Sequence, residues 1–206
     1  MQGLLCSHPS AAMAFGPVRS YACSDDIWPV QLDKTNEPHD FFSQQLQGGV
    51  IQTSTMVLYK KIFDSIGGFD EIECFAKGRR VQAEDYDLSL KLSYGHHLIA
   101  SPYATVKYRL HAEQSSVLVL EQTMLNFQYR VRFLKKLTAA ERNNIRVNDA
   151  VHRMQVRWEL TLENYCGKRA NADLWRLVIF GFRYNYFRIH TWPYLWRVIR
   201  HSLHKG

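Results

Sequence analysis

The spacing of hydrophobic residues changes part-way along the chain. In the first half they come in short, dense runs: residues 11–21 predict a strand, and the β-branched run 50–59 predicts a buried strand. Two more strands are predicted at 98–101 and 106–109. Residues 24–42 are polar, acidic and contain two prolines, which indicates a loop.

Two helices are predicted between these strands. The segment KKIFDSIGGFDE (residues 60–71) predicts a short helical turn that ends at Gly67 and Gly68. A longer helix is predicted from Glu84 to Gly95, because glycine favours a helix C-terminus. The first half of the chain therefore has the pattern of a mixed α/β fold.

From residue 115 onward the hydrophobic residues recur at steps of three and four, the period of an amphipathic helix. The first predicted helix covers residues 117–134. The second is opened by the capping box of Thr138 and Glu141 and ends at Gly167, and its apolar face consists of Val147, Val151, Met154, Trp158 and Leu162. A third helix is predicted at 174–189, after Asn171, and a fourth after Pro193. We therefore expect a boundary near residues 111–116, between an α/β part (1–114) and a C-terminal α-helical extension (115–206).

Composition changes this picture in one respect. The 206 residues are 46% hydrophobic, which excludes a disordered chain, and the net charge is +7. Residues 1–110 carry 10 basic and 12 acidic side chains, whereas residues 111–206 carry 16 and 7. The positive charge, a general attractant for nucleic acids, anionic membranes and phosphorylated substrates, therefore belongs to the helical part.

The location is expected to be cytoplasmic. The four cysteines are scattered without a C-x-x-C pair, so neither a zinc site nor a disulfide scaffold is indicated. We also expect no secretory signal and no membrane-spanning segment, because no basic N-terminal region precedes an apolar run and no apolar run is long enough to span a bilayer.

Three segments carry the candidate chemistry, in this order over residues 48–116: TSTMVLYKKIFDSIGGFDE, AEDYDLSLKLSYG and YRLHAEQSS. The second segment places Glu84, Asp85 and Asp87 at the start of a predicted helix. One interpretation is that these acids are there because the helix dipole favours them. The other is that they form a catalytic carboxylate site.

Together the three segments resemble the C-terminal half of the catalytic domain of family 2 glycosyltransferases, the inverting GT-A type. The resemblance implies a partial GT-A mixed sheet, of the nucleotide-diphospho-sugar transferase type. It implies transfer of a sugar from a nucleotide-sugar donor to a hydroxyl acceptor, saccharide or lipid-linked, with inversion. On this interpretation the protein is a hexosyltransferase-like enzyme.

The family's Glu-Asp motif matches Glu84 and Asp85. The resemblance implies that Asp85 is the catalytic base that removes the acceptor hydroxyl proton, and that Glu84 orients the acceptor or the base. We expect the helix N-terminus to keep the Asp85 carboxylate ionised. Asp87 is expected to cap the helix or to support substrate binding.

The resemblance also assigns roles around this motif. His111 matches the position that, in metal-using members, contacts a divalent ion such as Mg²⁺ or Mn²⁺; the alternative is a polar residue at a strand end. Arg109 is expected to pair either with the diphosphate or with a neighbouring acid. Gly67 and Gly68 are expected to form a tight turn that lets the backbone approach the substrate.

The sequence departs from the family in its first half. The nucleotide-binding strands and the Asp-x-Asp metal motif are expected to be missing, so that the chain is a fragment, inactive alone. Asp25 and Asp26 resemble the continuation of that motif, but only 22 residues separate Asp26 from Gly49 and only 23 precede Ser24. This spacing leaves no room for the remaining strands of the domain.

The basic C-terminal segment allows two interpretations. Residues 174–199 contain nine aromatic residues and four arginines. Arg169, just before this segment, and Arg176 and Arg183 within it are expected to form a basic stripe. The apolar face beside that stripe consists of Leu177, Phe180, Tyr184 and Phe187. Such a helix is expected either to lie on an anionic membrane, as in a peripheral membrane protein, or to pack on the α/β half or a partner subunit.

Three other functions are alternatives to glycosyl transfer. The first is a processive polymer synthase, but the segment Gln155 to Trp158 is one residue too short for the Gln-x-x-Arg-Trp motif of that class, which argues against it. A catalytically dead remnant that serves in membrane docking or interaction is a second alternative. A basic aromatic nucleic-acid-binding protein is a third, but no recognised nucleic-acid-binding module is present and we expect no nucleic-acid partner.

Overall fold

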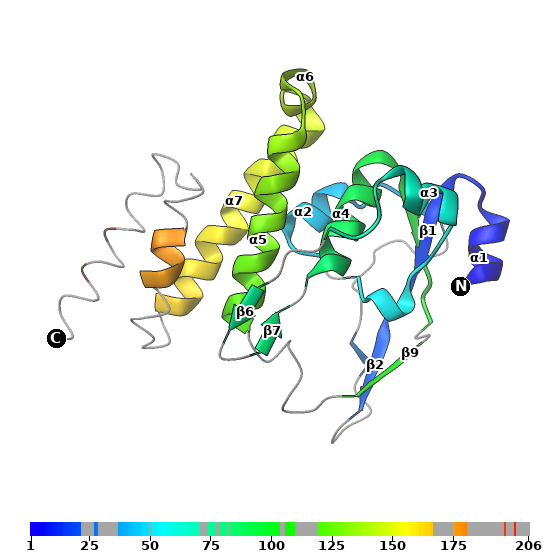
Figure 1. The fold of residues 1–206 in the computed structure, drawn as a ribbon, viewed down its shortest axis with the longest axis horizontal. Coiled ribbons are helices and arrows are strands. Elements are labelled where there is room, and N and C mark those ends of the chain that lie inside the picture. The colour runs from blue at the N-terminus through cyan, green and yellow to red at the C-terminus, as the bar shows by residue number, and fades with distance from the viewer. Residues whose placement is uncertain are drawn as a thin grey trace. The chain divides into compact units, whose positions relative to one another are not determined.

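Among the residues that the structure describes, the strands form three sheets (Figure 1). The structure is a computed structural model, and it describes residues 1–21, 27–28, 37–49, 51–70, 74–76, 79–81, 83–103, 106–109, 119–166, 175–180, 196 and 200. The strands are β1 (Ala11–Phe15), β2 (Val18–Tyr21), β3 (Ile27–Trp28), β4 (Pro38–His39), β5 (Val57–Leu58), β6 (Cys74–Ala76), β7 (Arg79–Val81), β8 (His97–Ala100) and β9 (Val106–Arg109). The helices are α1 (Gln2–Ser7), α2 (Phe42–Gln47), the 3-10 turn η1 (Thr53–Thr55), α3 (Lys60–Ser65), α4 (Glu84–Gly95), α5 (Val119–Lys136), α6 (Ala139–Arg142) and α7 (Ile145–Cys166).

The largest of these sheets is mixed and open, with the strand order β4-β8-β1-β5. β1 and β8 run parallel, with Ala14 opposite Ile99, while β5 and β4 add antiparallel strands at the two edges. All five residues of β1 are buried, as expected of a strand that is covered on both faces. The chain is therefore of the α/β class, as the sequence predicted.

The two faces of this sheet carry different layers. Because side chains alternate along a strand, Met13 faces one side and Ala14 the other. Met13 packs with Leu88 and Leu92, which lie one turn apart on α4. Ala14 packs with Leu5 of α1. The sheet thus fixes α4, the helix that begins with the three acids.

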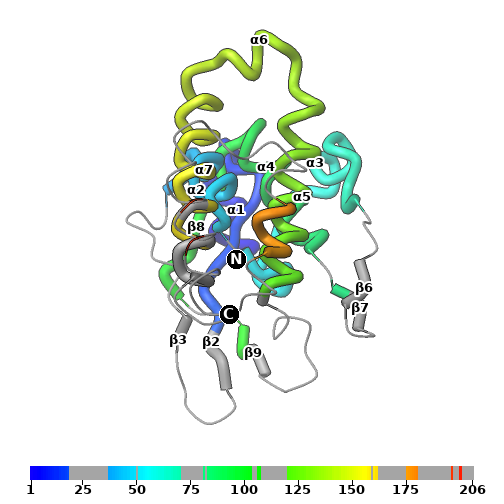
Figure 2. Tube along the Cα trace, turned by 90° about the vertical axis from the view of Figure 1, so that its left-hand side faces the viewer, coloured from blue at the N-terminus to red at the C-terminus, as the bar shows by residue number. Residues whose placement is uncertain are grey.

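The two smaller sheets extend and flank the first. β1 leads into β2 and β8 leads into β9, so the same two segments pair in parallel a second time, with Val18 opposite Val106. β3 pairs antiparallel with β2. β2 and β9 lie side by side in Figure 2. β6 and β7 form a separate antiparallel pair. The second of these strands comes shortly before α4 in the chain, so this hairpin connects the glycine turn after α3 to the acidic helix.

Most elements predicted in the first half are confirmed. The structure has the strands at 98–101 and 106–109 and the helix from Glu84 to Gly95 within a residue or two. The predicted strand 11–21 is divided into β1 and β2, which belong to two different sheets. The predicted buried strand 50–59 is wrong: this run contains η1 and only the two-residue strand β5. The Thr55 hydroxyl donates to the Gln52 carbonyl at 2.8 Å, and this local bond turns the chain where an extended strand would need free backbone groups.

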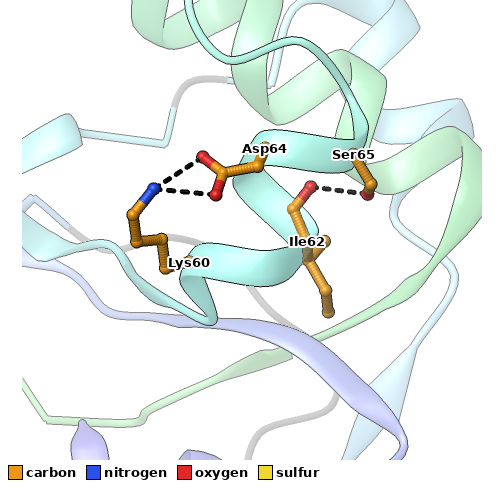
Figure 3. Close-up of polar contacts among 4 residues, drawn as sticks. All are labelled: Lys60, Ile62, Asp64 and Ser65. Atoms are coloured by element: carbon orange, nitrogen blue, oxygen red, sulfur yellow. Dashed lines mark hydrogen bonds and ion pairs between the residues drawn. The ribbon is translucent and has the colours of Figure 1, made fainter.

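The short helix α3 shows why the chain turns before the acidic helix. Lys60 and Asp64 form an exposed ion pair at 2.7 Å, four residues apart, and the Ser65 hydroxyl donates to the carbonyl of Ile62 (Figure 3). The helix then ends at two glycines with positive φ, 80° at Gly67 and 63° at Gly68. The predicted stop at Gly67 and Gly68 is thus confirmed.

In the helical second half the predicted helix 117–134 is confirmed as α5, whereas the predicted helices at 174–189 and after Pro193 lie mostly outside the described residues. Thr138 and Glu141 form the predicted capping box, with the Thr138 N–H donating to the Glu141 carboxylate at 2.8 Å, but this box opens the short helix α6. α7 begins afterwards, at Ile145. Within the described parts of the chain, no helix combines the length and apolar character needed to cross a membrane.

The contacts of the chain define two compact units, residues 1–133 and 134–206. This division falls within α5, after the change in hydrophobic spacing near residues 111–116. The first part of α5 therefore belongs to the same compact unit as the sheet and α4. The expected division into domains 1–114 and 115–206 concerns family architecture and stays a prediction.

Candidate functional site

The candidate site lies at the N-terminus of α4. Ala83 precedes the helix and offers no side-chain cap, while Glu84, Asp85 and Asp87 occupy the first turn. Acidic side chains there interact favourably with the helix dipole, so the dipole alone accounts for their presence. Their surroundings, however, differ from one acid to the next.

The Asp85 carboxylate is partly buried and accepts two hydrogen bonds. The backbone N–H of Tyr86 donates to Oδ1 at 2.8 Å, and the Thr53 side chain is the second donor. Burial nevertheless raises the pKa of Asp85 above its ordinary value, and the charge of Glu84 adds to the rise, because the hydrogen bonds offset only part of the desolvation. The helix N-terminus was expected to favour the ionised carboxylate, but the effect of burial on the pKa is larger. Asp85 therefore holds a proton more tightly than an exposed aspartate does.

Thr53 reaches Asp85 from η1, in the segment where the sequence predicted a strand. Thr53 is exposed, whereas Thr55 is buried and holds the turn through its bond to Gln52. The turn thus presents one hydroxyl to the acidic helix. A donor on a carboxylate fixes the rotamer of the acid and directs its other lone pairs outward.

Asp87 lies inside the fold. Its side chain is only 5% exposed and pairs with Lys91 Nζ at 2.5 Å, one helical turn further on. Lys91 Nζ also donates to the carbonyl of Gly68 at 3.2 Å. Lys91 therefore links the acidic helix to the turn after α3, and Asp87 serves this link as the ion-pair partner of Lys91.

A buried polar cluster lies behind the first turn of α4. The Tyr86 hydroxyl donates to the backbone carbonyl of Gln45 at 2.5 Å, and Arg130 Nε donates to the same hydroxyl at 2.6 Å. The Ser89 hydroxyl donates to the side-chain oxygen of Gln45 at 2.9 Å. Burial raises the pKa of Tyr86, which the positive charge of Arg130 partly offsets, so the phenol stays a neutral hydrogen-bond donor.

Arg130 is 3% exposed and comes from α5. Its guanidinium carbon lies 4.1 Å from the ring centroid of Phe127 and 5.3 Å from that of Tyr86, which stabilises the buried cation through both ring faces. Another α5 side chain, Tyr129, donates from its hydroxyl to the Asp70 carbonyl at 2.8 Å. α5 thus holds both the acidic helix and the glycine turn.

Gly67 and Gly68 are shaped by the turn itself. A Cβ on Gly68 would lie 3.0 Å from the Phe63 ring, whereas a Cβ on Gly67 would meet nothing within 4 Å. Gly68 is buried and its carbonyl is occupied by Lys91, while Gly67 is exposed. Their expected contact with substrate stays a prediction, and Gly67 is the one with room for it.

The remaining expected site residues lie at the border of the described chain. Arg109 ends β9 with its backbone paired to Tyr21, and its side chain is outside the described part. His111, Asp25 and Asp26 lie outside the described residues. In the described part of the chain, no three His, Cys, Asp or Glu side chains group as metal ligands, so we derive no step through Mg²⁺ or Mn²⁺.

Several residues of the site were missed by sequence reasoning. Lys91 had a readable signal, because an acid and a lysine four residues apart on a helix can pair. Thr53, Gln45 and Arg130 had none, since each comes from a distant element and meets α4 only in the folded chain.

The arrangement presents a single partly buried carboxylate of raised proton affinity at a helix N-terminus. Asp85 is suited to accept a proton from a hydroxyl that approaches the first turn, and Glu84 is next to it and also partly exposed. Comparisons of the chain with protein-family models, with curated proteins and with solved structures find no match.

Proposed function

We propose that the chain provides the acceptor side of an inverting glycosyltransferase of the GT-A type, with Asp85 as the general base. The observation that carries this proposal is the difference between the acids of one helical turn. Asp87 is committed to a buried ion pair, whereas Asp85 keeps a partly buried carboxylate with a raised pKa and a hydroxyl donor. A raised pKa brings a carboxylate closer to the proton affinity that a general base needs.

The reaction fits one base of this kind. The acceptor oxygen forms a bond to the anomeric carbon of the sugar while the bond from that carbon to the diphosphate breaks. The diphosphate leaves with the electron pair, and the hydroxyl proton passes to Asp85. Thr53 positions the carboxylate, and Glu84 orients the acceptor.

The test is a transfer assay in which the full chain is supplemented with a nucleotide-binding half, because the chain is expected to be inactive alone. Radiolabelled nucleotide sugars are supplied with mixed saccharide and lipid-linked acceptors, with and without Mg²⁺ or Mn²⁺. We expect Asp85→Asn to lower transfer by about 10²-fold or more, the usual contribution of a general base. The matched control is Asp64→Asn, an exposed aspartate paired with Lys60 on α3, which should retain full activity.

The alternatives give different results in the same assay. Full turnover by Asp85→Asn rejects the assigned base. A catalytically dead remnant gives no transfer and no saccharide binding by the unaltered chain. Because the nucleotide-binding half is expected to be missing, calorimetry should find weak binding or none for nucleoside diphosphates; tight, metal-dependent binding would contradict that expectation.

A further inference from the structure

The outward face of α7 combines exposed apolar and basic side chains. Val156 is 42% exposed and Leu160 is 46% exposed, one helical turn apart. Arg153 and Arg157 are also exposed and follow the same four-residue step. On a helix of 3.6 residues per turn these four positions form an apolar row with a basic row beside it. We call these four residues the α7 outer face.

The opposite face of α7 is occupied by the protein itself. Met154 and Trp158 are buried, and the Trp158 ring lies 5.6 Å from that of Phe180. Leu177 and Phe180, the described members of the apolar face expected for membrane contact, are therefore buried, and Phe180 packs within the helical part itself. Any surface for an external partner has to lie on the other side of these helices.

The short helix 175–180 has such an exposed side. Trp175 is 40% exposed and Ile179 is 63% exposed, again four residues apart, so they share the face that Leu177 and Phe180 do not occupy. We call this the Trp175 pair. A further tryptophan, Trp196, is 65% exposed. Single exposed apolar residues are ordinary, but pairs at helical spacing beside arginines are not explained by folding.

Charge selects the kind of partner. Residues 134–206 contain 14 basic and 5 acidic side chains, a net charge of +9, whereas residues 1–133 contain 12 and 14, a net charge of −2. Tryptophan and arginine together suit a bilayer interface, where indole rings lie at headgroup level and guanidinium groups bind phosphates. A nucleic acid would account for the arginines but not for the aliphatic rows of Val156, Leu160 and Ile179.

We propose that the α7 outer face docks residues 134–206 on an anionic lipid bilayer, lying in the interface without crossing it. The Trp175 pair lies on the other side of the helix contact between Trp158 and Phe180, so it does not face the same bilayer. The apolar side chains enter the region between headgroups and acyl chains, and the arginines bind lipid phosphates. This inference is independent of the proposed glycosyl transfer. A bilayer-bound chain without transferase activity would leave it intact.

The test measures binding of the full chain to lipid vesicles by sedimentation. Vesicles of phosphatidylcholine alone are compared with vesicles of phosphatidylcholine and phosphatidylglycerol. We expect binding to the anionic vesicles only, weakened by added salt.

Variants assign the binding to one of the two surfaces. Replacing Arg153 and Arg157 by Gln should weaken binding by about 30-fold, because each basic residue near an anionic surface contributes roughly a fivefold factor. Val156→Ser with Leu160→Ser should weaken it by at least about 10-fold, whereas Trp175→Ser with Ile179→Ser should leave it unchanged. The matched control is Tyr103→Ser, which removes a side chain that is 76% exposed in residues 1–133 and should have no effect. Circular dichroism confirms that each variant is folded.

Specific outcomes overturn the proposal. Equal binding to neutral and anionic vesicles removes the role of charge. Unchanged binding by Val156→Ser with Leu160→Ser removes the role of the α7 outer face, as does an equal loss in the Tyr103→Ser control. Binding of a single-stranded oligonucleotide that displaces the vesicles, and that neither apolar double variant weakens, assigns the surface to nucleic acid instead.

Discussion

Three acids in one helical turn illustrate how position on a helix sets the role of a residue. Asp87 points to the interior and pairs with Lys91, with a side chain only 5% exposed. Asp85 lies closer to the surface, where Thr53 donates to it and burial raises its pKa. Because the two differ by about 200° around the helix axis, the same residue type meets the core in one case and the site in the other.

The raised pKa of Asp85 predicts a stability effect with a definite sign. The folded chain holds the Asp85 proton more tightly than the unfolded chain does, so the associated stability is present below the ordinary pKa of 3.8 and is lost as the pH rises through the folded-state value. At neutral pH the ionised carboxylate is therefore a net cost. We expect Asp85→Asn to raise the Tm at neutral pH, with the gain disappearing at a pH below 3.8.

Thermal melts across this pH range check the prediction. Asp64→Asn serves as the control, because Asp64 is exposed on α3. A lower Tm for Asp85→Asn at neutral pH, with no dependence on pH, would contradict this prediction. It would mean that the ionised Asp85 carboxylate stabilises the fold.

At the scale of elements, α4 is fixed by neighbours on three sides: the sheet below it, α2 through Gln45, and α5 through Arg130. The sequence predicted α4 to the residue because an acidic first turn, a continuous apolar side and Gly95 all agree. It failed at 50–59, where β-branched residues suggested a strand but Thr55 formed a local turn. Asp85 was identifiable only through a family resemblance, whereas the donors and the lysine around it depend on tertiary contacts that no local pattern contains.

The contact of Gly48 with Arg130 gives a prediction for these elements. Gly48 ends α2 with a φ of 109°, and a Cβ there would lie 2.6 Å from Arg130 Nη2. We expect Gly48→Ala to destabilise the fold by about 2 kcal/mol, combining left-handed backbone strain with displacement of a buried guanidinium. Gly95→Ala is the matched control, because a Cβ there meets nothing within 4 Å, and it should leave stability unchanged or raise it slightly. Urea unfolding measures both, and equal effects would show that Arg130 moves aside at no cost.

At the scale of the whole molecule, the chain divides both by contacts and by charge. The unit 1–133 holds the sheet, the acidic helix and the α5 residues that brace it, while 134–206 holds all of the excess positive charge. The candidate active site needs only the first unit, and the proposed membrane surface needs only the second. Separate cores allow each function to be altered without the other.

Trp158 tests this separation. It is fully buried in the second unit and packs on Phe180, so Trp158→Ala should remove about 3–5 kcal/mol from the packing of that unit. Because the two units are compact by themselves, we expect limited proteolysis of the variant to cut within 134–206 while residues 1–133 stay protected. Mass spectrometry of the fragments identifies the cut sites. If cleavage spreads equally through β1, β8 and α4, the two units unfold as one, and the basic helices are then part of what keeps the acidic helix and its carboxylate in place.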